Sequence, residues 1–108
     1  LGLSGRDQVP EGTGMLFVLP REEVVAFHML NCRVPLDVAF ISRDGRIVEI
    51  RTMAVEPDPA NPKCLYSSRF PARYALEAAG GALARAGVKV GDTVELLGAA
   101  KDAAKAAQ

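Results

Sequence analysis

The sequence predicts an α+β domain that is compact and β-rich, with a partly open, barrel-like sheet and one or two short helices. Apolar runs of strand length are separated by glycine and proline turns, and an Asp-Gly pair joins two of them. Alanine-rich helix formers gather toward the carboxyl end. A chain of 108 residues supports one core, so we assign residues 1–97 to a single domain and 98–108 to an Ala- and Lys-rich tail.

Each strand is predicted from an apolar run bounded by turn residues. The run at 15–19 is continuous and ends at Pro20, a residue that central strands do not accommodate. In the run at 24–30 alternate residues point to opposite faces, so Phe27 and His28 lie on different sides. In chain order, the predicted strands are 15–19, 23–30, 36–41, 46–55, 74–78 and 93–97, and residues 81–85 form a short helix.

Two segments are less regular than these strands. Residues 56–71 contain four of the seven prolines, which excludes a helix or a central strand and indicates a long loop. Residues 72–97 also allow a second interpretation, a single helix interrupted by the glycine pair at 80–81. The local pattern leaves both interpretations of that segment open.

Composition and charge exclude several classes of partner. The 13 basic and 13 acidic residues cancel, and neither sign forms a run, so we expect no nucleic-acid binding. No apolar stretch approaches the roughly 20 residues that a transmembrane helix needs, so we expect no membrane span in this chain. The sequence contains neither a G-x-G-x-x-G nor a P-loop pattern and no C-x-x-C pair, and we predict no cofactor and no bound metal.

Several fragments occur together in an order that is similar to one known family. They are GMLFVL at 14–19, F-x-M-x-N at 27–31, PLD at 35–37, an Asp-Gly hairpin, ARY-x-LE at 72–77 and GVKVGD at 87–92. In this combination the chain resembles the domain of unknown function 192 (DUF192) family of bacterial and archaeal proteins. The resemblance implies a β-rich α+β fold and an exported or periplasmic location, with the leader and an opening strand missing from this chain. It implies no particular activity.

The chain departs from the family pattern within one motif. Where members usually read Phe-Trp-Met-Lys-Asn-Thr, residues 27–32 read Phe-His-Met-Leu-Asn-Cys. The tryptophan ring and the lysine charge are therefore both replaced, whereas Asn31, Pro35 and Asp37 are retained. A mechanism that required this lysine would be absent from this protein.

Polar residues concentrate in the 28–37 turn and the 62–74 loop. Asn31 and Asp37 flank a proline turn, where such side chains commonly bond backbone groups, so we expect Asp37 to be mainly a structural acceptor. The functional alternative is a polar pair at the mouth of a cleft. The tentative ligand-binding residues are His28, Asn31, Asp37, Cys64, Tyr66 and Arg73, and we predict no catalytic residue.

The two cysteines and the only histidine allow three further interpretations, each of which we favour less than a ligand-binding role. Cys32 and Cys64 could form a disulfide, which an exported protein would favour. Together with His28 they could provide three zinc ligands, although no close ligand pair supports this. A Cys-His nucleophile pair would need hydrogen-bond contact and an orienting third group, and no motif marks one.

The leading hypothesis for function is a noncatalytic domain that binds a small polar ligand or a protein partner through the turn and the loop. The first alternative is a hydrolase that uses Asp37 with His28 or Cys64. The second alternative is a purely structural interaction module. Convergence of the six tentative residues on one cavity would favour a ligand site, and a nucleophile beside a base would favour the enzyme.

Overall fold

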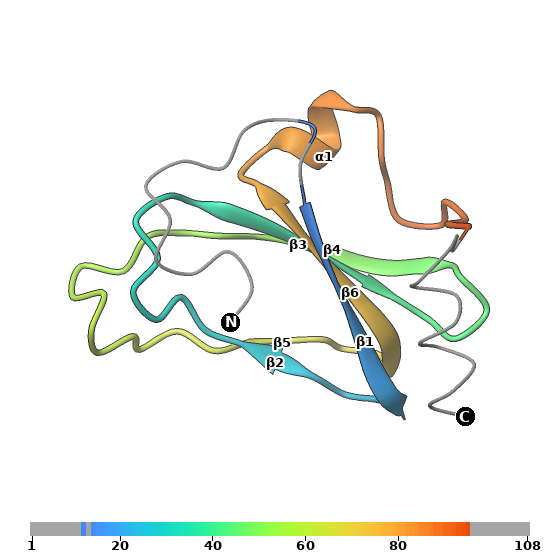
Figure 1. The fold of residues 1–108 in the computed structure, drawn as a ribbon, viewed down its shortest axis with the longest axis horizontal. Coiled ribbons are helices and arrows are strands. Elements are labelled where there is room, and N and C mark those ends of the chain that lie inside the picture. Colours follow the sequence, from blue (N-terminus) through green and yellow to red (C-terminus); the bar gives the residue numbers. More distant parts are fainter. Residues whose placement is uncertain (1–11, 13, 96–108) are drawn as a thin grey trace.

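The computed structural model describes residue 12 and residues 14–95 of the chain. Four strands form an antiparallel sheet in the order β1-β6-β3-β4, and β2 and β5 form a separate antiparallel ribbon (Figure 1). The elements described are β1 (Gly14–Glu23), β2 (Ala26–Phe27), β3 (Leu36–Ile41), β4 (Ile47–Met53), β5 (Tyr66–Ser67), β6 (Ala72–Ala79) and α1 (Ala82–Arg85). The α+β class with one short helix and a β-rich body is therefore confirmed.

Strand β3 lies inside the sheet, between β6 and β4, and all six of its residues are buried. Val38 and Phe40 point to one face and Ala39 and Ile41 to the other, because side chains alternate along a strand. The near-continuous apolar run in this segment is typical of a strand that is covered on both faces. Asp37 is the one charged residue in this strand.

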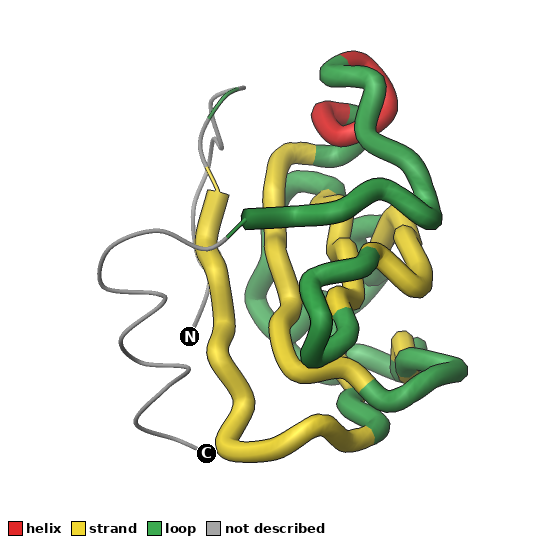
Figure 2. Tube along the Cα trace, turned by 90° about the vertical axis from the view of Figure 1, so that its right-hand side faces the viewer, coloured by secondary structure: helices red, strands yellow, loops and turns green. Residues whose placement is uncertain are grey.

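The sheet therefore separates two hydrophobic cores. The first core contains Phe40 and Met53 and extends to Met29, which follows β2, so the ribbon covers this face. The second core contains Ile41 and Tyr74 and extends to Leu83 of α1. The helix lies at the end of β6, where Figures 1 and 2 show it beyond the strand ends. Each face of the sheet is thus closed by a different part of the chain.

The Asp-Gly hairpin between β3 and β4 is confirmed. Ser42 N–H donates to the carbonyl of Arg46 at 2.8 Å, and Gly45 N–H donates to the carbonyl of Ser42 at 3.0 Å. Gly45 has φ +85°, and a Cβ on it would lie 2.7 Å from the carbonyl oxygen of Val94. Glycine is required here both for the left-handed backbone and for the close approach of the 94 segment.

Several predicted boundaries are wrong. Strand β1 continues through Pro20, because it is an edge strand and its pairing with β6 becomes irregular between Val18 and Glu23. The strand expected at 23–30 is reduced to β2, and a short β5 lies inside the predicted long loop. Residues 93–95 contribute a single bridge, Arg46 to Thr93, and residues 96 and 97 lie outside the described residues. Strand β6 excludes the single-helix interpretation of 72–97.

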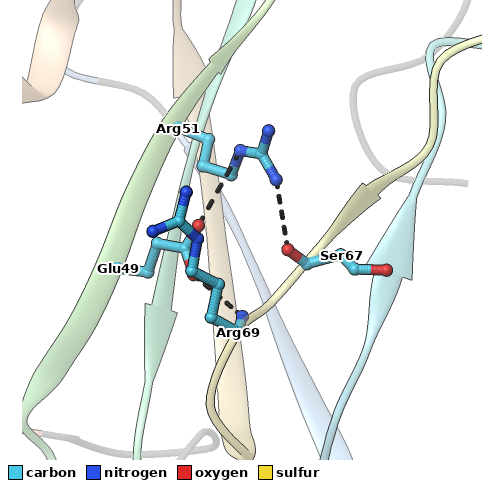
Figure 3. Close-up of polar contacts among 4 residues, drawn as sticks. All are labelled: Glu49, Arg51, Ser67 and Arg69. Carbon is cyan, nitrogen blue, oxygen red and sulfur yellow. Dashed lines mark hydrogen bonds and ion pairs between the residues drawn. The ribbon is translucent and has the colours of Figure 1, made fainter.

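The sheet does not close into a barrel. In the described part of the chain no ladder of backbone hydrogen bonds joins β4 to β5. Side chains bridge the space between these two strands instead (Figure 3). Arg51 Nη1 donates to the carbonyl of Ser67 at 3.2 Å, and the Tyr66 hydroxyl accepts from Ala54 N–H at 3.3 Å.

Candidate functional site

Asp37 lies inside the protein, with 2% of its surface exposed. Its Oδ1 accepts from Thr52 Oγ1 at 2.8 Å and from Gly81 N–H at 2.9 Å, and its Oδ2 accepts from Leu83 N–H at 3.2 Å. The carboxylate thus satisfies two of the backbone donors that the start of α1 leaves without intrahelical partners. Its contacts are those of a structural acceptor, as the sequence suggested, and they leave it no place at a cleft mouth.

Asn31 and Cys64 both have backbone roles. Asn31 has φ +54°, the only positive φ outside glycine in the described residues, and asparagine tolerates this conformation better than most residues. Its N–H donates to the carbonyl of Pro59 at 2.8 Å, which joins the 28–37 turn to the long loop. Cys64 is exposed and its N–H donates to Glu56 Oε2 at 3.0 Å. The turn and the loop therefore meet, but through main-chain bonds.

The other three predicted residues lie in three different surroundings. His28 is exposed on the rim of a small cavity on the ribbon side of the sheet. Arg73 is buried in β6, with its guanidinium carbon 5.4 Å from the centre of the Tyr74 ring. Tyr66 lies under Arg51, whose guanidinium carbon is 5.3 Å from the ring centre. The six tentative residues do not converge on one concavity.

Both cysteines are free thiols, Cys32 buried and Cys64 exposed, so the structure contains no disulfide between them. The Cys32 thiol is directed at the carbonyl of Leu30, with an S to O distance of 3.7 Å. Within residues 12 and 14–95 no group of three or more His, Cys, Asp or Glu side chains is arranged to hold a metal ion. The structure also does not bring Asp37 to His28, because the two lie on opposite sides of the sheet.

A different group of residues forms a site at the space between β4 and the loop after β5. We call it the arginine groove, and its volume is about 310 Å³. Its polar residues are Glu49 and Arg51 of β4 and Arg69 after β5 (Figure 3). Its apolar walls are formed by Val48, Ile50, Phe70 and Val90.

Hydrogen bonds hold two of these polar side chains in place. Glu49 Oε1 accepts from Arg69 N–H at 2.9 Å, and Glu49 Oε2 lies 3.8 Å from Arg51 Nε. Arg51 is held further by the Ser67 carbonyl and the Tyr66 ring, yet 36% of its side chain remains exposed. The Arg51 guanidinium is therefore positioned by its neighbours and still reaches solvent, which suits recognition of a planar anion.

The Arg69 guanidinium has no hydrogen-bond or ion-pair partner among the described residues. The hydrogen bond that Arg69 makes to Glu49 is donated by its main-chain N–H. Figure 3 shows its side chain folding back toward Glu49 and Arg51. The lining of the groove thus contains two guanidinium groups and one carboxylate, an excess of one positive charge. Beside this charge, Phe70 and Val90 are 55% and 57% exposed. The groove thus combines an excess of positive charge with an exposed apolar surface.

The sequence contains a signal for part of this site that our prediction did not use. Glu49 and Arg51 alternate with apolar residues in the segment RIVEIRTM. They are spaced two residues apart with the buried Met53, so all three side chains point to the same face of the strand. Charged residues at core-facing positions of a strand are uncommon and indicate a specific partner. Arg69 lies in a loop without periodicity, so its position beside β4 could not be deduced from the sequence.

The pH dependence of thermal stability tests whether the Glu56 carboxylate stabilises the loop that precedes β5. Hydrogen bonds from the backbone N–H of Cys64 and then of Lys63 lower the pKa of Glu56 below its usual 4.5. A carboxyl whose pKa is lower in the folded state stabilises the protein above its unfolded-state pKa and loses that contribution as the pH falls. We expect the difference in melting temperature between the parent and Glu56→Gln to be constant above about pH 6 and to shrink below pH 4.5.

Thermal unfolding of both proteins from pH 3 to pH 7 measures this difference. The matched control is Glu23→Gln, which alters an exposed carboxylate in β1 away from the loop. Parallel curves for the parent and Glu56→Gln across the whole range would show that Glu56 does not stabilise the loop through its charge.

The architecture is shared with known proteins. The model of the DUF192 family, described as "Uncharacterized ACR", matches residues 1–96. A search of curated proteins finds no match. No helix in residues 12 and 14–95 combines the length and apolarity that crossing a membrane requires.

Two crystal structures are similar over most of the chain. A protein described as a candidate transcription regulator from Sinorhizobium meliloti 1021 is 37% identical, with a TM-score of 0.76 over 87% of this chain and 70% of that chain. A protein of unknown function from Novosphingobium aromaticivorans DSM 12444 is 32% identical, with a TM-score of 0.73 over 88% of this chain and 65% of that chain. The chain belongs to the DUF192 family.

Proposed function

We propose that this protein is a noncatalytic domain that binds a small anionic ligand, a carboxylate attached to an apolar group, in the arginine groove. The observation that carries the proposal is the Arg69 guanidinium, which lies beside a second arginine and has no polar partner in the described residues. An added carboxylate would neutralise the excess positive charge and accept paired N–H bonds from a guanidinium.

The walls of the groove favour a ligand with an apolar portion. Phe70 and Val90 are exposed hydrophobic side chains that lie against the two arginines. A ring or alkyl group attached to the carboxylate would remove apolar surface of both residues from water, at roughly 25 cal/mol per Å². A fully hydrated inorganic anion would leave this surface exposed, so we favour an organic acid.

The residues of the groove support binding rather than catalysis. The lining residues include no serine, cysteine, histidine or lysine, so the groove has no nucleophile paired with a base. The hydrolase alternative needs the Asp37 carboxylate, which already accepts three hydrogen bonds inside the protein. A purely structural module would account for the bonds of Glu49 and Arg51 across to the β5 side, and it would give the exposed Arg69 guanidinium no ligand. An exported, periplasmic location remains part of the proposal.

Titration with benzoate, followed by amide shifts in NMR spectra, tests the proposal. Benzyl alcohol is the neutral probe with the same ring, and benzylammonium is the probe with the opposite charge. We expect benzoate to shift the amides of Glu49, Arg51 and Arg69, and Arg69→Gln to weaken its affinity by roughly tenfold or more. The matched control, Arg21→Gln, removes an exposed arginine of β1 that does not line the groove, and it should leave the affinity unchanged.

Two results would contradict carboxylate binding in the groove. One is equal binding of benzoate and benzyl alcohol, which would show that the charge contributes nothing. The other is an unchanged benzoate affinity in folded Arg69→Gln. Stronger binding of phenyl phosphate than of benzoate would support the site and replace the carboxylate by a phosphate as its ligand.

A further inference from the structure

A second cavity, of about 230 Å³, lies on the ribbon side of the sheet and is separate from the arginine groove. Residues from β1, β2, the turn after β2 and β6 line it: Phe17, Ala26, Phe27, His28, Leu30, Cys32 and Glu77. It is mostly apolar, and Glu77 is the one acidic residue in its lining. This cavity therefore combines a carboxylate with aromatic walls.

Glu77 faces the first core because of its position in β6. It is two residues from Ala75, which belongs to that core, and residues two apart share one face of a strand. Its register partner on β1 is Met15, which also packs against the first core. Only 7% of Glu77 is exposed. A carboxylate so well shielded from water attracts a nearby cation more strongly than one on the open surface.

The aromatic rings beside Glu77 complement a cation with an apolar body. The rings of Phe17 and Phe27 have centroids 5.5 Å apart and planes inclined by 58°. Such rings attract an ammonium group through their faces and cover the apolar part of a ligand. An engineered apolar cavity of about 150 Å³ is large enough to bind benzene, so the space here accommodates one aromatic ring.

The remaining polar groups of the lining have contacts within the turn. The Cys32 thiol is directed at the Leu30 carbonyl. Leu30 N–H donates a hydrogen bond to His28 Nδ1 at 3.4 Å. Neither group adds a negative charge to the cavity. Glu77 is therefore the one acidic side chain among the described residues that line the cavity.

We propose that this cavity binds a small primary amine in its protonated form, with its aromatic ring packed against Phe17 and Phe27 and its ammonium group at Glu77. Glu77 already has an interaction partner inside the protein. This does not prevent ligand binding, because the two oxygens of a carboxylate accept about four hydrogen bonds. The site is independent of the carboxylate-binding function proposed for the arginine groove.

Titration of the full chain with benzylammonium, monitored by amide shifts, tests this second site. We expect benzylammonium to shift the amides of Phe27, His28 and Glu77 and to bind at least roughly tenfold more tightly than benzyl alcohol, which lacks the charge. Glu77→Gln should reduce that preference to about twofold or less, because the amide keeps the shape and removes the charge. The matched control, Glu23→Gln, should retain the preference of the parent.

Phe27→Leu provides a second variant in case Glu77→Gln does not fold. It keeps an apolar side chain but removes a ring, so the amide shifts should persist with an affinity lower by roughly three- to tenfold. Three results would overturn the proposal: no shift at this cavity, equal binding of benzylammonium and benzyl alcohol, or an unchanged preference in folded Glu77→Gln. Benzoate binding at the groove is scored separately, so failure of one site is distinguishable from failure of the other.

Discussion

Asp37→Ala is expected to lower the free energy of unfolding by about 3–4 kcal/mol. The substitution leaves the N–H groups of Gly81 and Leu83 without their acceptor at the start of α1, together with the hydroxyl of Thr52. A buried donor that loses its partner costs about 1–3 kcal/mol. At roughly 4–8 °C per kcal/mol for a domain of this size, the melting temperature should fall by well over 10 °C. Urea unfolding followed by circular dichroism measures the free energy directly.

Thr52→Ala is the matched control for Asp37→Ala. It removes one of the three donors to the same carboxylate, and Thr52 is exposed, so it should cost about 1 kcal/mol or less. If Asp37→Ala cost no more than Thr52→Ala, Asp37 would not be the structural acceptor described above. The hydrolase alternative, in which Asp37 acts chemically, would then regain support.

Phe40→Ala is expected to lower the free energy of unfolding by about 3–5 kcal/mol. Phe40 is fully buried and is one of the largest buried side chains among the described residues. It packs in the first core, where its ring centroid lies 6.0 Å from that of Phe27. Removing the ring forfeits its transfer free energy and leaves a cavity that the surrounding strands cannot fill completely.

Phe70→Ala is a control that removes the same side chain from a different environment. Phe70 is more than half exposed, so the same truncation should change the free energy of unfolding by less than about 1 kcal/mol. Chemical denaturation of both variants compares the two directly. Similar losses for Phe40→Ala and Phe70→Ala would mean that the first core is not packed around β3 as described.

Elements that depend on neighbouring residues were predictable from the sequence. The strand at 36–41 and the Asp-Gly hairpin each result from local chemistry, an apolar run and a left-handed glycine, whereas the short helix near 81–85 was one of two interpretations that the sequence left open. The end of β1 was not predictable in this way. Whether Pro20 ends a strand depends on whether that strand lies at an edge, and this is decided by which strands pair.

The candidate site shows the same division. The sequence singled out Tyr66 and the 62–74 loop, and the structure places Tyr66 under Arg51. It could not bring Arg69 to Glu49, because the two lie 20 positions apart and the segment between them includes most of the long loop, whose path depends on packing. Nor could it place Glu77 and Phe27 in the lining of one cavity, since that arrangement requires the ribbon to cover one particular face of the sheet.

The sequence by itself determined the class of the domain, its family and its hairpin, because the patterns that indicate them are local apolar runs, turn residues and short motifs. Only the tertiary structure decided that Asp37 caps α1, that two arginines meet in a groove and that a buried carboxylate faces aromatic rings. These arrangements depend on strand order and on which core each strand face adjoins, and both are settled by packing between segments that are distant in sequence.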